Sequence, residues 1–141
     1  MAAVSITGSD VVPGQNASFQ DGVAGEAIDA GDWVAFETDE ADGDYGKVVK
    51  AEQADPSRSE VIGIAVNAAL AAGQPVRYAT PGSDVTVGSV VAQGTIYVLG
   101  TDGAMEEEAD RDASDYVVVC AVGKSGTSIR VLASYPDVQH P

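Results

Sequence analysis

The sequence is poor in basic residues and in cysteine. Its 141 residues include 7 Lys and Arg against 22 Asp and Glu, which gives a formal net charge of −15. A surface this acidic repels phosphate groups, so we expect neither nucleic acid nor an anionic membrane as a partner. The one cysteine, Cys120, excludes an internal disulfide framework and a cysteine-rich zinc site.

Histidine is equally scarce, and this bears on catalysis. The one histidine, His140, is the penultimate residue, so we expect neither a fixed catalytic triad nor a histidine-bound metal. Cys120 lies in the apolar run 118–122, where no basic neighbour activates a thiol. We therefore predict that the protein is not an enzyme and that it has no catalytic, cofactor-binding or metal site.

Long hydrophobic runs are also missing. No window approaches the roughly 18 uncharged apolar residues of a membrane-spanning helix. Residues 1–7 carry no basic charge and do not match a secretory signal. We expect a chain that is made in a cytoplasm and stays soluble.

Valine dominates the large apolar residues that are present, whereas leucine occurs at only three positions. β-Branched residues suit pleated sheets, and the 16 glycines are spread along the chain as turn residues. These features predict an all-β fold, a single small barrel or sandwich of about seven to nine short strands, with little or no helix.

The predicted strands share valine-rich or alternating patterns, and they cover residues 33–37, 47–51, 61–66, 75–79, 84–87, 94–99, 116–122 and 128–132. The nearly continuous apolar run 61–66 indicates a strand buried on both faces. Asp102-Gly103 is typical of a tight turn. The last two strands form the clearest hairpin, for which we expect Gly126 at positive φ.

A short motif occurs three times, in residues 30–38, 72–80 and 93–101. In each copy a glycine (Gly31, Gly73 or Gly94) precedes a strand, and apolar residues follow three and five positions later. This spacing places both apolar residues on one face of a strand. The motif therefore indicates turn glycines that feed half-buried strands.

The ends of the chain differ in pattern from its middle. Residues 1–18 show little periodicity and predict an extended N-terminal arm that orders on a partner. Residues 135–141 contain two prolines and predict a C-terminal surface tail. The β-domain is expected to span residues 19–134, a usual size for one domain.

Two acidic stretches, residues 37–44 and 106–115, hold much of the negative charge. The first does not fit a calcium-binding EF-hand loop, because counting from Glu40 places Tyr45 at the glycine position and Ala51 at the glutamate position. It resembles the lipoyl-domain hairpin, but Glu40 stands where that family has its acceptor lysine. The second could hold a pair of glycosidase carboxylates, but such a pair needs a cleft with stacking aromatic residues, and only 6% of this chain is aromatic. We predict that both stretches are solvated loops.

Two segments carry a wider resemblance: residues 24–36 (AGEAIDAGDWVAF) and residues 61–76 (VIGIAVNAALAAGQPV). With the closing hairpin, they resemble the small capsid decoration (cement) proteins of tailed bacteriophages over residues 20–133. The resemblance implies a structural protein on the exterior of the virion, without cofactors. Such a protein binds the major capsid protein as a trimer, bridges its subunits and stabilises the assembled head.

Within this hypothesis the arm grips the capsid through its apolar residues, namely Val4, Ile6, Val11 and Val12. The aromatic residues expected in the core or at a subunit interface are Trp33, Phe36, Tyr78 and Tyr97. An alternative is a head-fibre or carbohydrate-binding β-domain, which requires an exposed platform of aromatic side chains.

Overall fold

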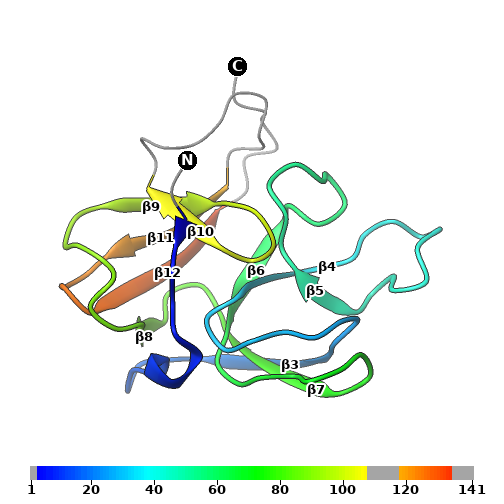
Figure 1. The fold of residues 1–141 in the computed structure, drawn as a ribbon, viewed down its shortest axis with the longest axis horizontal. Coiled ribbons are helices and arrows are strands. Elements are labelled where there is room, and N and C mark those ends of the chain that lie inside the picture. The colour runs from blue at the N-terminus through cyan, green and yellow to red at the C-terminus, as the bar shows by residue number, and fades with distance from the viewer. Residues whose placement is uncertain (1–2, 108–117, 135–141) are drawn as a thin grey trace.

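The computed structural model describes residues 3–107 and 118–134, which are almost entirely β-structure (Figure 1). The described residues contain one three-residue 3-10 helix, η1 (Gly8–Asp10), and twelve strands: β1 (Ala3–Val4), β2 (Val12–Pro13), β3 (Phe19–Val23), β4 (Trp33–Phe36), β5 (Val48–Lys50), β6 (Val61–Ala65), β7 (Pro75–Ala79), β8 (Asp84–Thr86), β9 (Ile96–Leu99), β10 (Met105–Glu107), β11 (Val119–Gly123) and β12 (Ser128–Ser134). The predicted all-β class is confirmed. The eight predicted strands correspond to β4–β9, β11 and β12, while β1, β2, β3 and β10 were not predicted.

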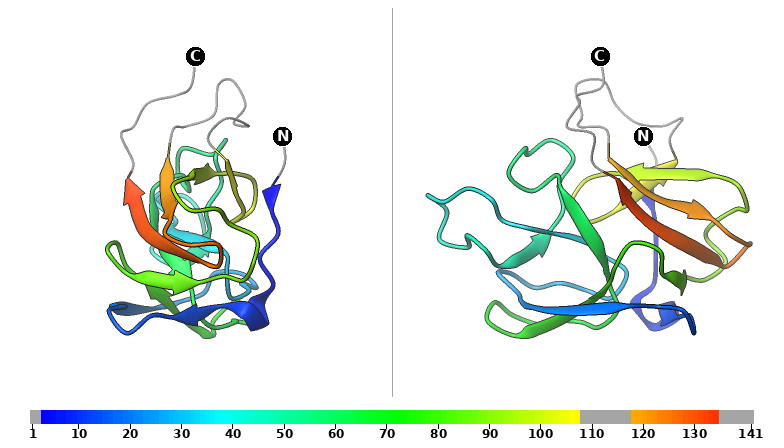
Figure 2. Two further views of the ribbon diagram at one scale, coloured as in Figure 1. Left: turned by 90° about the vertical axis from the view of Figure 1, so that its left-hand side faces the viewer. Right: turned by 180° about the vertical axis from the view of Figure 1, so that it is seen from behind.

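The strands form two antiparallel sheets that pack as a sandwich (Figure 2). The seven-stranded sheet has the order β1-β10-β9-β11-β12-β8-β2, and the five-stranded sheet has the order β3-β7-β6-β4-β5. The five-stranded sheet curls until its two edges approach at the bridge between Ala24 and Val48. Neither sheet closes into a barrel. No helix in the described residues is long and apolar enough to cross a membrane.

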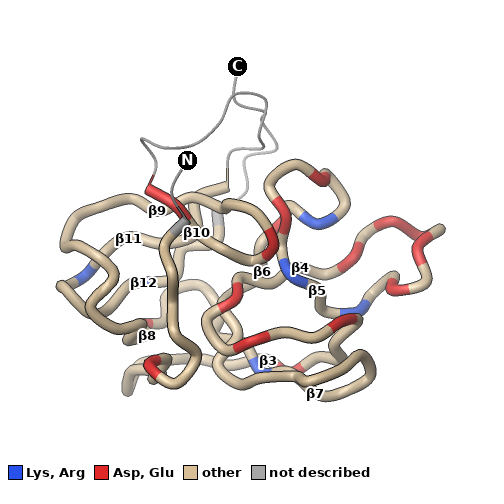
Figure 3. Tube along the Cα trace, in the orientation of Figure 1, with Lys and Arg blue, Asp and Glu red and all other residues tan. Residues whose placement is uncertain are grey.

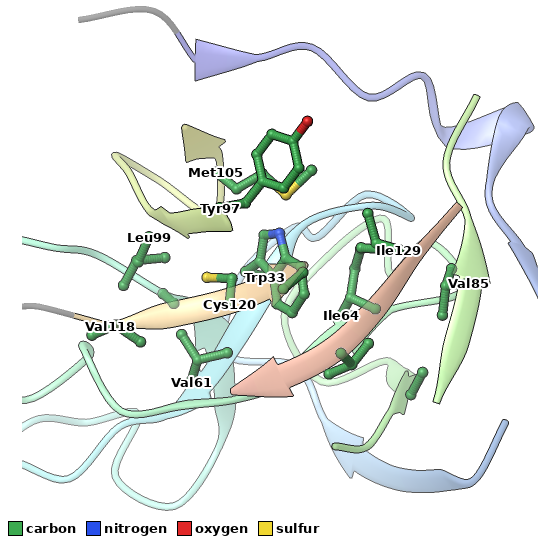
Figure 4. Packing of buried hydrophobic residues seen from close by; sticks show 14 of the residues in the cluster. Trp33, Val61, Ile64, Val85, Tyr97, Leu99, Met105, Val118, Cys120 and Ile129 are labelled. Atoms are coloured by element: carbon green, nitrogen blue, oxygen red, sulfur yellow. The ribbon is translucent and has the colours of Figure 1, made fainter. Parts of the chain in front are cut away.

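Buried side chains form two clusters, one on each face of the five-stranded sheet. Trp33 and Ala35 belong to the cluster between the sheets, and Val34 belongs to the second cluster. Successive strand residues point to opposite faces, so β4 is buried on both. Figure 4 shows Trp33 deep within the cluster between the sheets, near Cys120. The prediction that β6 is buried on both faces is confirmed, since Ile64 packs into the first cluster and Ala65 into the second.

The repeated motif corresponds to three turns, as predicted, and the glycine of each turn has a positive φ angle. Gly31, Gly73 and Gly94 have φ angles of 96°, 90° and 79°, which side chains disfavour. The apolar residues that follow are largely buried; in the second copy, Val76 and Tyr78 both enter the second cluster. The period-two pattern therefore marks the inward face, as predicted.

The predicted tight turn at Asp102-Gly103 and the predicted closing hairpin of β11 and β12 are both present, but the turn of the closing hairpin differs from the prediction. Asp102 and Gly103 both have positive φ, 51° and 79°, which is the type I′ geometry expected between β9 and β10. The turn between β11 and β12 does not place Gly126 at positive φ, so that detail was wrong. The Ser125 hydroxyl holds this turn instead, because it accepts hydrogen bonds from the Thr127 and Ser128 N–H groups at 3.2 and 3.1 Å.

The N-terminal segment is extended and lies on the domain. Through β1 it pairs with β10, and through β2 it pairs with β8, so one short segment borders both edges of the seven-stranded sheet. Val4, Ile6 and Val11 are half-buried against the cluster between the sheets. Burial of these apolar side chains favours the position in which the N-terminal segment packs against the domain. The two ends of residues 3–13 therefore belong to this sheet in the structure, and η1 lies between them.

Candidate partner-binding surface

The residues predicted to grip a partner differ in how much surface they offer. Val4 pairs with Met105, and Ile6 contacts Gly31, where an added methyl group would lie 2.7 Å from the Ile6 Cγ2 atom. Val12 is 55% exposed. Of the four apolar arm residues, Val12 is thus the one whose side chain is mostly open to solvent.

The four aromatic residues expected in the core or at an interface separate into two kinds. Trp33, Tyr97 and Tyr78 are buried in the clusters. Tyr97 also accepts a hydrogen bond at its hydroxyl from the Ala92 N–H group at 2.9 Å. Phe36 is 38% exposed and meets Tyr78 edge to face, with ring centroids 6.4 Å apart. Phe36 is the one of the four whose ring reaches the surface.

The loop between β4 and β5, residues 37–47, is rich in carboxylates (Figure 3). Its conformation is held locally, because the Asp39 carboxylate accepts the Ala41 N–H group at 3.0 Å and the Asp42 carboxylate accepts the Asp44 N–H group at 2.8 Å. Asp39 is exposed, while Asp42 and Asp44 are half-buried. Among the described residues, no group of three or more His, Cys, Asp or Glu is arranged to hold a metal ion.

Glu37 corrects the prediction that this whole stretch is solvated. Its side chain is 2% exposed and pairs with Arg58, whose Nε lies 3.0 Å from Glu37 Oε1. Arg58 also reaches Glu26 at 3.4 Å and Asp42 at 3.7 Å. Burial opposes the charge of Arg58, but the hydrogen bond and charge of Glu37 raise its pKa overall. One guanidinium therefore joins the loop to two other segments.

The second acidic stretch is also not wholly solvated. Glu106 lies in β10, between Ala3 of β1 and Val98 of β9, and its side chain is fully buried. Glu107 is exposed. Residues 108–115 lie outside the described part of the chain.

A surface without charge lies on the connection between β6 and β7. Residues 61–76 contain no charged side chain, and Leu70 within them is 78% exposed. Val23 is 50% exposed and pairs with the exposed Pro75 across β3 and β7. We define the neutral surface by its exposed apolar members, namely Val23, Leu70, Ala71, Ala72 and Pro75.

The neutral surface is fixed by main-chain hydrogen bonds to the segment before β4. The Gly73 N–H group donates to the Ala24 carbonyl at 2.7 Å, and Ile28 and Ala69 exchange two hydrogen bonds of 2.8 Å. The uncharged run was visible in the sequence. Its exposure was not, because the same apolar residues are equally compatible with burial.

A glycan-binding platform would need several exposed aromatic residues. Tyr45 is 53% exposed, whereas Tyr78 and Tyr97 are buried. Tyr116 and Tyr135 lie outside the described residues.

A scan against models of known protein families finds no match to this chain, and a search of curated proteins finds no similar sequence.

Proposed function

We propose that the protein is a structural virion protein that binds the outside of an assembled phage capsid and stabilises it by bridging major capsid protein subunits. The observation that carries this proposal is the neutral surface on an otherwise strongly acidic chain. Exposed apolar residues gathered in one place are typical of protein contact sites.

The two segments that resemble decoration proteins lie against each other in the fold. The Gly31 N–H group donates to the Ala65 carbonyl at 2.8 Å, and Ala24 exchanges hydrogen bonds with Gly73 and Gln74. Residues 61–76 supply every member of the neutral surface except Val23, and residues 24–36 support them through these hydrogen bonds. The resemblance is therefore concentrated in the part of the molecule that is suited to contact.

The charge distribution is also compatible with this role. Carboxylates gather on the loop between β4 and β5, and the loop between β6 and β7 carries none (Figure 3). Such a protein stays soluble before assembly through its acidic regions. Many modest contacts, multiplied by the copies on one capsid, then provide firm attachment.

The test compares phage heads assembled with and without the protein. We expect it to co-purify with intact heads in a number of copies set by the capsid symmetry, and heads without it to break at a lower temperature. Adding the purified protein back should restore the original breakage temperature. If it is absent from particles, and heads without it survive heating equally well, the proposal is overturned.

A further inference from the structure

A pocket lies between the N-terminal segment and the turn that joins β9 and β10. Its volume is about 270 Å³, and residues from three distant parts of the chain line it. Val4 and Ile6 form one side, Met105 contributes a further apolar wall, and Asp32 and Asp102 supply carboxylates. Drug-sized ligands occupy pockets of about 300–1,000 Å³, so this pocket lies just below that range.

The electrostatics of the pocket favour a cation. Asp32 is half-buried, and burial raises the pKa of its carboxyl group. The hydrogen bond from the Asp29 N–H group and the charge of Lys50 lower this pKa, whereas the charges of Asp29 and Glu26 raise it, and the overall direction is upward. No Lys or Arg of the described residues forms an ion pair with Asp32 or Asp102. A partly desolvated carboxylate that has no ion pair is stabilised in its charged form when a cation binds next to it.

We propose that this pocket binds a lysine side chain presented by a partner protein. The methylene stem of the lysine packs on Val4, Ile6 and Met105, and its ammonium group pairs with Asp32 and Asp102. Long cationic side chains commonly bury their stems on apolar surface in this way while the charged end meets polar groups.

The geometry favours lysine over arginine. Arginine recognises carboxylates best as a planar fork that engages both oxygens. Asp32 Oδ2 already accepts the Asp29 N–H group at 2.9 Å, which leaves Oδ1 for a ligand. A compact ammonium group needs one such oxygen, and Asp102 lines the same pocket.

The proposal does not depend on the identity of the partner, so it can be tested on the isolated full-length protein. The probe is Nα-acetyl-lysine methylamide, titrated into ¹⁵N-labelled protein and followed by the amide signals of Gly31 and Gly103. The matched control is the norleucine derivative, which has the stem without the ammonium group. We expect the lysine derivative to shift these signals and to bind more tightly than the norleucine and arginine derivatives.

Variants distinguish lysine binding in the pocket from non-specific attraction to the acidic surface. Asp32→Asn should weaken lysine binding roughly tenfold, since it removes a charge-assisted hydrogen bond. Asp102→Asn should weaken it less, and asparagine tolerates the positive φ at this position. Asp39→Asn, on the exposed acidic loop, should have no effect.

Three results would overturn the proposal. The first is equal binding of the lysine and norleucine derivatives, and the second is no shift at Gly31 and Gly103. The third is an equal loss of affinity in Asp39→Asn and Asp32→Asn. A failure here leaves the capsid proposal standing, because the head-binding assay is a separate measurement.

Discussion

The loops 37–47 and 66–74 both leave the five-stranded sheet, yet they present opposite chemistry. The first carries carboxylates that are held by Arg58 and by local turns. The second has no charge and exposes Leu70, while main-chain hydrogen bonds hold it to the segment before β4. The charged loop satisfies its polar groups within the chain and in water. The neutral loop leaves apolar surface uncovered.

This difference assigns two roles to different loops: the acidic loop favours solubility, and the neutral loop is suited to contact with a partner. The composition of the chain alone does not distinguish these roles. A high net charge of one sign favours solubility, because like-charged molecules repel one another. Contact with a partner needs surface whose burial is favourable, and burial of a charge without a partner costs free energy. The neutral surface meets this requirement better than the acidic loop does. Substitutions in one loop, each matched by a control substitution elsewhere in the chain, can test this difference.

The largest effect is expected at Arg58, which organises the acidic loop. Arg58→Met leaves the buried Glu37 carboxylate without its ion pair, so the free energy of unfolding should fall by about 3 kcal/mol. Urea denaturation measures the change. Arg77→Met is the control, because its pair with Asp21 is largely exposed, and its stability should be nearly unchanged. Equal losses in both variants would contradict the distinction between buried and exposed pairs.

The second prediction places the same new charge on each loop. Leu70→Asp should weaken binding to heads by about tenfold, because it puts a charge on the surface that we propose is buried on contact. Ala41→Asp adds an equal charge at an exposed position of the acidic loop and should leave binding unchanged. Co-sedimentation with heads measures both. If Ala41→Asp weakens binding as much as Leu70→Asp, the partner contacts the acidic loop.

Asp84 extends the comparison to a carboxylate outside both loops. Hydrogen bonds from Arg130 and Lys124 lower its pKa to about 2, and it also accepts a hydrogen bond from Asn16 at 3.1 Å. A lowered pKa stabilises the folded state above the unfolded value of 3.8, and this contribution is lost as the pH falls towards 2. Solvent screening reduces the effect to about 1 kcal/mol.

Urea denaturation between pH 5 and pH 2 tests this contribution. Asp84→Asn should show a shallower loss of stability with acid than the original chain, and Asp39→Asn should follow the original curve. Identical acid profiles for all three proteins would show that the Asp84 contacts contribute nothing to folding.

The sequence predicted elements whose signals are local. Valine alternation marked the strands, and Gly31, Gly73 and Gly94 marked turns because a positive φ favours glycine at a single position. β1 and β2 have two residues each, which is too short for a period to show. The burial of Glu37 depends on Arg58, 21 positions away, and no local pattern records such a pairing.

The candidate site was less predictable than the fold, because it also depends on contacts between residues that are distant in the sequence. The uncharged run 61–76 was present in the sequence, but the exposure of Leu70 follows from how the loop lies against Ala24 and Ile28. The pocket joins residues near positions 4, 32 and 103 of the chain. Only the folded sheet brings these three regions together.

The smallest expected effect on stability comes from replacing one glycine in each loop by alanine. Gly73 has a φ of 90° with open space around an added methyl group, so Gly73→Ala tests backbone strain without a clash. It should lower the free energy of unfolding by about 1 kcal/mol. Gly43 in the acidic loop has equally open space and no positive φ, so Gly43→Ala should be neutral or stabilise by up to about 0.5 kcal/mol, because alanine restricts the unfolded chain. Urea denaturation distinguishes the two. Equal effects would mean that the neutral loop does not require its turn glycine, and that its exposed apolar residues are held less firmly than the hydrogen bonds to Ala24 imply.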